Sequence, residues 1–169
     1  MITLITGATH TGKTNLASVL MRKYSCPFYS IDHLKMGLIR SGNTKLTPMS
    51  DDALLTEYLW PIVREIIKTA IENRQDLIIE GCYIPLDWAE DFTEEYKREI
   101  KFICLAMSEE YIENHYDDIL KFADIVERRW GEGRPSKEYL IRENKKVLDM
   151  CKARGISPFV INDVYEITI

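Results

Sequence analysis

The N-terminal stretch MITLITGATHTGKT, residues 1–14, decides the fold of this chain. A run rich in Ile and Leu ends at Gly7, and the segment Gly7–Thr14 then fits the pattern G-x-x-x-x-G-K-[ST]. This pattern is typical of a loop that cradles phosphates, provided that a buried strand precedes it and a helix follows it. The short apolar run before Gly7 predicts a strand of a parallel sheet that is covered on both faces.

The sequence after the loop predicts a helix over residues 13–24, because its apolar residues recur at helical spacing. Glycines let the backbone approach a ligand closely, and the N–H groups at a helix start bind anionic phosphate. Lys13 adds a cation for the terminal phosphates, and the hydroxyl of Thr14 is placed to bind Mg²⁺. An ordinary glycine turn before a helix is the alternative. Both flanks favour a nucleoside triphosphate site, formed by Gly7, Ala8, Thr9, His10, Thr11, Gly12, Lys13, Thr14 and Asn15, with His10 contributing only its backbone.

Composition narrows the class of protein. The chain has 169 residues, of which 46% are hydrophobic and 29% are charged, so we expect one globular domain over residues 1–169. The net charge of −5 argues against a broad nucleic-acid surface, which is normally basic. No apolar stretch approaches the roughly 20 residues of a membrane span, and no signal peptide is recognisable, which predicts a cytoplasmic protein without a membrane partner. The cysteines are widely spaced and are expected to be buried or incidental thiols.

Strand and helix patterns alternate along the rest of the chain. Further strands are expected at 27–31, 76–81, 100–107 and 157–163, and further helices at 32–40, 51–73, 86–98, 109–130 and 136–154. Pro61 falls inside one helical pattern and predicts a kink, or two helices that meet at Trp60–Pro61. Such alternation is typical of an α/β fold with a mainly parallel sheet, in which ligands bind beyond the carboxyl ends of the strands.

Two acidic residues follow expected strands and therefore fall at the same edge of the sheet as the phosphate loop. Asp32 could accept a proton from an acceptor hydroxyl or hold a water on Mg²⁺, or it could cap the following helix. Glu80 ends the run LIIE and could face Mg²⁺, or it could simply terminate its strand. We favour the functional interpretation of both acids, because the phosphate loop already requires acidic groups at this edge.

The segment ERRWGEGRPSKEYLIREN, residues 127–144, combines arginines with two glycines. Arginine stabilises the charge that spreads over a phosphoryl group during transfer, and a segment that closes over the site excludes water. We therefore predict a mobile lid at about 121–136 that carries Arg128, Arg129 and Arg134. The alternative is a set of solvated charges, offset by the neighbouring glutamates.

In chain order, these features resemble the P-loop small-molecule kinases, which include adenylate, shikimate and gluconate kinases, zeta-toxin-like kinases and proteins labelled 2-phosphoglycerate kinases. The resemblance implies a P-loop NTPase fold with three α/β/α layers, a five-stranded parallel sheet of order 2-3-1-4-5 and a helical lid. It also implies ATP and Mg²⁺ as cofactors, and transfer of the terminal phosphate to the hydroxyl or phosphate of a small-molecule acceptor. We expect a monomer or a homodimer without a nucleic-acid partner.

The resemblance assigns roles to individual positions. Catalytic roles fall to Lys13, Asp32, Arg128, Arg129 and Arg134, and metal-binding roles to Thr14, Asp32 and Glu80. The stretch EGCYIP after the third strand lacks the arginine with which adenylate kinases grip the acceptor's phosphate, although Arg40 or Arg64 could supply that contact. The alternative function is a nucleotide-binding protein or NTPase switch without an acceptor. The guanine-reading pattern Asn-Lys-x-Asp of such switches is absent, and a pure binder would not need these acids and arginines.

Overall fold

The computed structural model describes residues 1–122 and 134–165 of the chain. Its centre is a parallel sheet with the strand order β2-β3-β1-β4-β5, as the resemblance implied. The strands are β1 (Ile2–Gly7), β2 (Phe28–Ser30), β3 (Leu77–Glu80), β4 (Ile100–Met107) and β5 (Phe159–Ile161). All the strands expected from the sequence are therefore confirmed.

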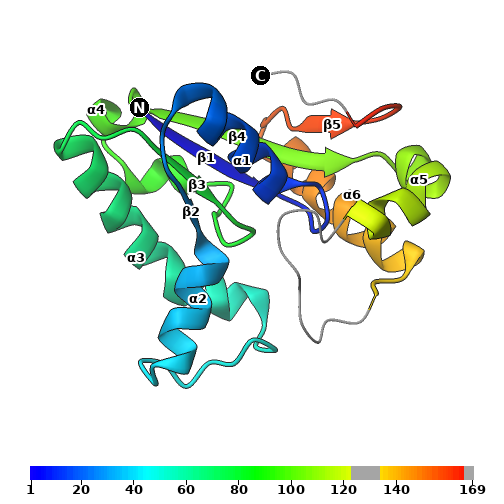
Figure 1. The fold of residues 1–169 in the computed structure, drawn as a ribbon, viewed down its shortest axis with the longest axis horizontal. Coiled ribbons are helices and arrows are strands. Elements are labelled where there is room, and N and C mark those ends of the chain that lie inside the picture. The colour runs from blue at the N-terminus through cyan, green and yellow to red at the C-terminus, as the bar shows by residue number, and fades with distance from the viewer. Residues whose placement is uncertain (123–133, 166–169) are drawn as a thin grey trace.

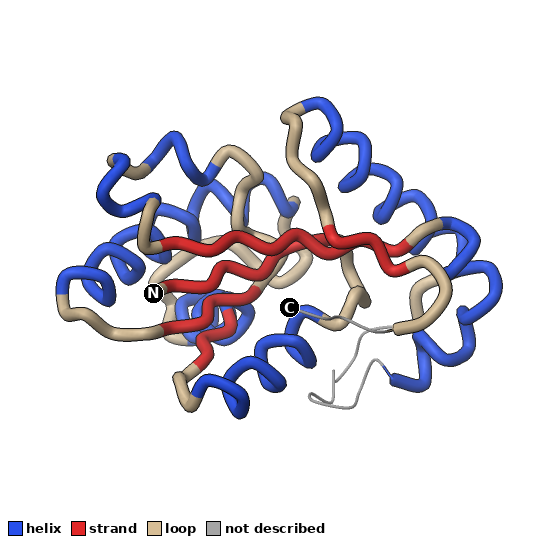
Figure 2. Tube along the Cα trace, turned by 90° about the horizontal axis from the view of Figure 1, so that it is seen from above, coloured by secondary structure: helices blue, strands red, loops and turns tan. Residues whose placement is uncertain are grey.

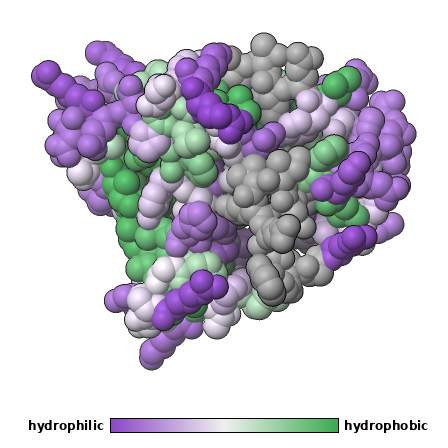
Figure 3. Space-filling model, in the orientation of Figure 1, coloured by the Kyte–Doolittle hydropathy of each residue, from purple (hydrophilic) through white to green (hydrophobic). Residues whose placement is uncertain are grey.

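Helices cover both faces of this sheet, so the structure has three layers (Figure 1 and Figure 2). Helix α1 (Lys13–Tyr24) packs on one face, whereas α3 (Asp52–Glu72) and α6 (Lys137–Ala153) pack on the other. The remaining elements are α2 (Ile31–Arg40), the 3₁₀ turn η1 (Trp88–Asp91), α4 (Glu94–Lys97) and α5 (Glu109–Phe122). None of the described helices is long and apolar enough to cross a membrane. Hydrophilic side chains cover much of the face seen in Figure 3, in keeping with the charged fraction of the sequence.

The side chains of β1 alternate between the two helical layers. Ile5 belongs to the core beneath α1, together with Leu16 and Leu20 of that helix. Ile2 and Leu4 belong to the core beneath α3. Every residue of β1 is buried, as expected for a central parallel strand. The phosphate loop therefore starts from the most enclosed strand of the sheet.

Helix α3 differs from the sequence expectation, because one continuous helix runs through Pro61. The prediction of two helices that meet at Trp60–Pro61 is therefore wrong. Pro61 is exposed, so the carbonyl that loses its helical partner there is open to water. The buried residues Leu59, Trp60 and Val63 hold the helix against the core on both sides of the proline.

Residues 86–98 form a 3₁₀ turn and a single turn of helix, so the continuous helix predicted there is wrong. Phe92 lies between the two turns with extended backbone angles (φ −126°, ψ 145°) and a buried side chain. Its ring packs edge-on against Trp60 and Trp88. Aromatic packing therefore overrides the helical pattern at this point. The expected continuation of α5 to residue 130 lies outside the described residues.

Candidate active site

The phosphate loop leads from β1 into α1. Gly7 has a φ of 133°, and a Cβ at this position would overlap the carbonyl oxygen of Leu105 on β4. Glycine therefore lets the loop lie against β4, where the N–H of Ala8 donates to that same oxygen at 3.0 Å. Helix α1 begins directly after Gly12, and no described side chain caps it. Its first N–H groups are thus left for an anionic ligand.

Lys13 lies across the loop that it follows. Its Nζ donates to the carbonyl oxygen of Ala8 at 2.7 Å and to that of Gly7 at 3.3 Å. Thr11 is buried below and braces the loop, because its hydroxyl also donates to the Ala8 oxygen, at 2.8 Å. The ammonium group is therefore held at the mouth of the loop by carbonyls, which a phosphate can replace as its partner.

Thr14 and Glu80 meet at the carboxyl edge of the sheet. The hydroxyl of Thr14 donates to Oε2 of Glu80 at 3.3 Å, and the Glu80 side chain is buried. The pairing of β1 with β3 sets Glu80 beside Ile5, just before the phosphate loop. A hydroxyl and a carboxylate oxygen so close together fit two neighbouring ligands of Mg²⁺, which completes its octahedron with water and phosphate oxygens. Residues 1–122 and 134–165 hold no cluster of three or more acidic, His or Cys side chains that could bind a metal by itself.

Asp32 lies in the first turn of α2, and the N-cap of that helix is Ser30. The alternative in which Asp32 caps the helix is therefore wrong. Its Oδ1 instead accepts a hydrogen bond from Nζ of Lys35 at 2.6 Å, and both side chains line the cavity described below. The carboxylate is thus held at the cavity wall by a lysine that the sequence analysis did not single out.

Tyr83 connects this ion pair to the segment after β3. Its hydroxyl accepts a hydrogen bond from Nζ of Lys35 at 2.9 Å, and the ammonium lies 5.0 Å from the centre of its ring. Burial raises the pKa of Tyr83, and the Cys82 thiol and the carboxylates of Asp32 and Asp52 raise it further. The phenol therefore keeps its proton, and Tyr83 holds Lys35 as a neutral acceptor.

These groups surround a cavity of about 1640 Å³ at the carboxyl edge of the sheet. A cavity for one small ligand has roughly 300–1,000 Å³, so this one has room for a nucleotide and an acceptor. Its central wall contains the loop residues Gly7, Ala8, Thr9, His10, Gly12, Lys13, Thr14 and Asn15, together with Glu80. The α2–α3 end is lined by Asp32, Lys35, Pro48, Met49, Asp52, Ala53, Thr56, Glu57, Cys82 and Tyr83. The α5–α6 end is lined by Tyr111, His115, Asp118, Ile119, Phe122, Tyr139, Glu143, Lys146, Val147 and Met150.

Tyr165, after β5, is a further cavity residue that the sequence analysis missed. Its hydroxyl lies 3.4 Å from the carbonyl oxygens of Thr11 and Gly12, and burial raises its pKa. A Cβ on Gly12 would overlap this hydroxyl, so the tyrosine packs directly on the phosphate loop. No local pattern marks Tyr165, because only the fold brings the end of the chain to its beginning.

Most of the predicted lid lies outside the described residues. Arg128 and Arg129 are among the residues that are not described, so their roles stay predictions. Arg134 is described and exposed. The two residues that follow it, Pro135 and Ser136, line the cavity. The chain therefore leaves the predicted lid at the cavity wall.

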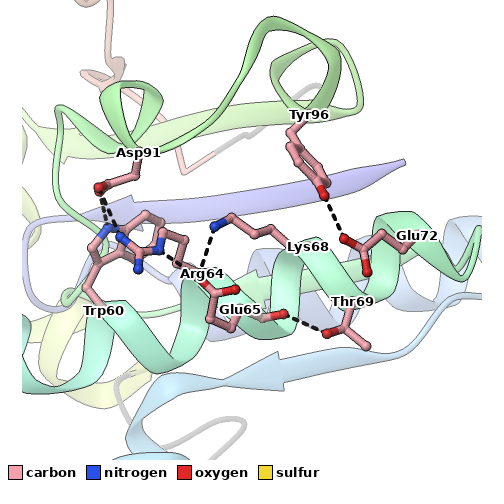
Figure 4. Close-up of polar contacts among 8 residues, drawn as sticks. All are labelled: Trp60, Arg64, Glu65, Lys68, Thr69, Glu72, Asp91 and Tyr96. Atoms are coloured by element: carbon pink, nitrogen blue, oxygen red, sulfur yellow. Dashed lines mark hydrogen bonds and ion pairs between the residues drawn. The ribbon is translucent and has the colours of Figure 1, made fainter.

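Arg64, which could have contacted an acceptor phosphate, is engaged between α3 and η1 (Figure 4). Its Nη1 donates to Oδ1 of Asp91 at 3.2 Å, and its Nε donates to Oε1 of Glu65 at 3.0 Å. Trp60 donates from Nε1 to the other oxygen of Asp91 at 2.7 Å, which fixes this carboxylate. Hydrogen bonds to the two acids raise the pKa of Arg64. Arg40 lies exposed at the end of α2.

The strand order, the three layers and the glycine loop before α1 define the fold of the P-loop small-molecule kinases. Among solved structures, the chain is similar to a shikimate kinase from Bacteroides thetaiotaomicron, with a TM-score of 0.55, 16% identity, and coverage of 96% of this chain and 86% of that one. It is also similar to a sugar kinase from Janibacter sp. HTCC2649, with a TM-score of 0.51, 17% identity, and coverage of 95% and 84%. The Pnkp1/Rnl/Hen1 RNA repair complex gives a TM-score of 0.52 at 16% identity, over 88% of this chain and 45% of that one.

No protein-family model and no curated protein matches the chain. The likeness to solved structures is confined to the fold, because the identities are all low. Activity and substrate must therefore be argued from the site itself.

Proposed function

We propose that this protein is an ATP- and Mg²⁺-dependent kinase that transfers the terminal phosphate of ATP to a hydroxyl group of a small-molecule acceptor. The observation that carries this proposal is the position of Asp32 in the wall of the cavity that also contains Lys13, Thr14 and Glu80. A site that only bound or hydrolysed a nucleotide would not need the space at the α2–α3 end. We further propose that residues 1–169 act as one domain in the cytoplasm, as a monomer or homodimer.

The loop residues would bind ATP through its phosphates. The N–H groups at the start of α1 bind the phosphate oxygens, and Lys13 exchanges its two carbonyl partners for the terminal phosphates. Thr14 and Glu80 would hold Mg²⁺, with Asp32 within the same wall to orient one of its waters. When bound, the metal neutralises charge that develops on the transferred group.

The transfer step needs a base at the acceptor hydroxyl. Oδ1 of Asp32 is occupied by Lys35, so Oδ2 takes the hydroxyl proton. The acceptor oxygen forms a bond to the terminal phosphorus as the bond from phosphorus to the bridging oxygen breaks, and the electron pair of that bond leaves with ADP. Arg128, Arg129 and Arg134 are proposed to stabilise the moving phosphoryl group from the lid, with at least one of them contributing much more than the others.

Kinase activity can be tested with γ-labelled ATP and a panel of small metabolites. Lys13→Ala should abolish transfer of the label without lowering the unfolding temperature, because its Nζ contacts only loop carbonyls. Asp32→Asn should lower kcat roughly 10²–10⁴-fold, the usual loss for a general base, with little change in the KM for ATP. Asp149→Asn, at an exposed position on α6 outside the cavity wall, is the matched control and should change neither constant.

Two outcomes would contradict the proposal. ATP hydrolysis that no metabolite accelerates would support the alternative, an NTPase or nucleotide-binding protein without an acceptor. An Asp32→Asn variant that keeps wild-type kcat would remove the base from the mechanism. In that case the carboxylate would serve only as the partner of Lys35.

A further inference from the structure

The charges at the α2–α3 end of the cavity are unusual for a site that receives an acidic metabolite. Three carboxylates line this end, those of Asp32, Asp52 and Glu57, against one cation, Lys35. Asp32 and Asp52 act on the same neighbour, since both raise the pKa of Tyr83. They are therefore close enough to act together on a bound ligand.

The cation of Lys35 is already committed. Its Nζ donates to Asp32 at 2.6 Å and to the hydroxyl of Tyr83 at 2.9 Å. Its side chain is only 13% exposed, and the ammonium lies over the tyrosine ring. Binding of a carboxylate or phosphate by Lys35 would break this arrangement and leave Asp32 without its partner.

No other described cation serves this end of the cavity. Arg64 is engaged with Asp91 and Glu65, and Arg154 lies 3.9 Å from Asp87. Lys13 belongs to the phosphate loop, and Lys146 lines the α5–α6 end. Within residues 1–122 and 134–165, nothing at the α2–α3 end offsets the charge of an anionic acceptor.

Asp52 and Glu57 lie in the first two turns of α3, and neither forms an ion pair with another described residue. Two carboxylates in a site that excludes water are costly to desolvate unless a cation joins them. A protonated amine on the acceptor supplies that cation and would be attracted by both groups.

We propose that the acceptor is a hydroxyl compound that bears a protonated amine and no acidic group, such as an amino sugar or an amino alcohol. The hydroxyl meets Asp32 and the terminal phosphate, while the amine meets Asp52 and Glu57. The phosphoryl group passes to the hydroxyl oxygen, Asp32 takes the proton, and the amine keeps its charge throughout. This inference rests on the proposed kinase function and adds the chemical class of its acceptor.

The test uses small metabolites of a cell extract, separated by ion exchange into cationic, neutral and anionic pools. Each pool is incubated with the full-length protein, Mg²⁺ and γ-labelled ATP, and labelled products are separated from ATP and inorganic phosphate. We expect transfer of label to a compound of the cationic pool. Label in a compound of the neutral or anionic pool alone would overturn the inference and leave the kinase function intact. Label that appears only as inorganic phosphate with every pool would overturn the kinase function itself.

A double variant, Asp52→Asn with Glu57→Gln, checks the residues. For the cationic acceptor its KM should rise about tenfold or more, the factor that corresponds to the loss of one modest interaction, with the KM for ATP unchanged. Glu95→Gln, on α4 outside the cavity wall, is the control and should leave both constants unchanged. An unchanged acceptor KM in a folded double variant would overturn the assignment of the amine to these two carboxylates.

Discussion

Replacement of Gly7 by alanine tests the contact that seats the phosphate loop on the sheet. The backbone of Gly7 has a φ of 133°, and an added Cβ would overlap the carbonyl oxygen of Leu105. A side chain at such a φ costs about 1–3 kcal/mol. The overlap adds about 1–3 kcal/mol more, because the oxygen belongs to the backbone of β4 and cannot rotate away. We expect Gly7→Ala to lower the free energy of unfolding by about 2–6 kcal/mol in total.

Two other glycines separate strain from overlap. Gly42 has a φ of 75°, but a Cβ added there would meet no described atom within 4 Å, so Gly42→Ala should cost only the strain, about 1–2 kcal/mol. Gly37 lies inside α2 with open space around it, and Gly37→Ala should stabilise the protein by about 0.5–1 kcal/mol.

Thermal unfolding of the three variants measures these differences, at about 2–4 °C per kcal/mol for a chain of this size. The expected order of unfolding temperatures is Gly37→Ala above wild type, then Gly42→Ala, then Gly7→Ala. If Gly7→Ala and Gly42→Ala unfold at the same temperature, the loop does not approach β4 as described, and the placement of Lys13 loses its support.

Three further predictions concern the cavity. Thr14→Val should raise the Mg²⁺ concentration required for half-maximal activity, because it removes the hydroxyl that meets Glu80, whereas Thr14→Ser should not; equal Mg²⁺ titrations would exclude Thr14 as a ligand. Cys82 is exposed to the cavity, but desolvation by its surroundings raises the pKa of its thiol. Its alkylation by iodoacetamide should therefore be slow at neutral pH and should accelerate only above about pH 8.5, the ordinary thiol value, and rapid labelling at neutral pH would contradict the structure. Tyr165→Ala should raise the KM for ATP several-fold, whereas Tyr165→Phe, which loses only long hydrogen bonds, should change it less than about twofold; equal effects in an ATP titration would contradict a role for the ring.

The sheet could be predicted from the sequence because each buried strand is a short apolar run followed by a glycine, an acid or a helix start. The helical layer was less predictable. Pro61 would break an isolated helix, but α3 is held by its buried face, and the exposed side of the helix tolerates the missing hydrogen bond. The pattern at 86–98 failed for the opposite reason, since the ring of Phe92 gains more in the aromatic core than a helix would provide.

The candidate site divides in the same way. Lys13, Thr14 and the glycines could be predicted because the loop is continuous in sequence and its chemistry depends on the backbone. Glu80 could be predicted from the rule that parallel strands end at one edge. Tyr165 could not, because its contact with the loop joins the two ends of the chain.

Lys35 shows most clearly where sequence reasoning ends. The pair Asp32 and Lys35 is separated by three residues in an expected helix, so their contact could have been derived from helical spacing. That contact alone would leave Lys35 available to an anionic acceptor. The second contact, to the hydroxyl of Tyr83, comes from a segment that lies 48 positions along the chain, and it is this contact that fixes the cation away from a ligand. The motif therefore predicts phosphoryl transfer, whereas the charge of the acceptor follows only from how the fold pairs the charges around Asp32.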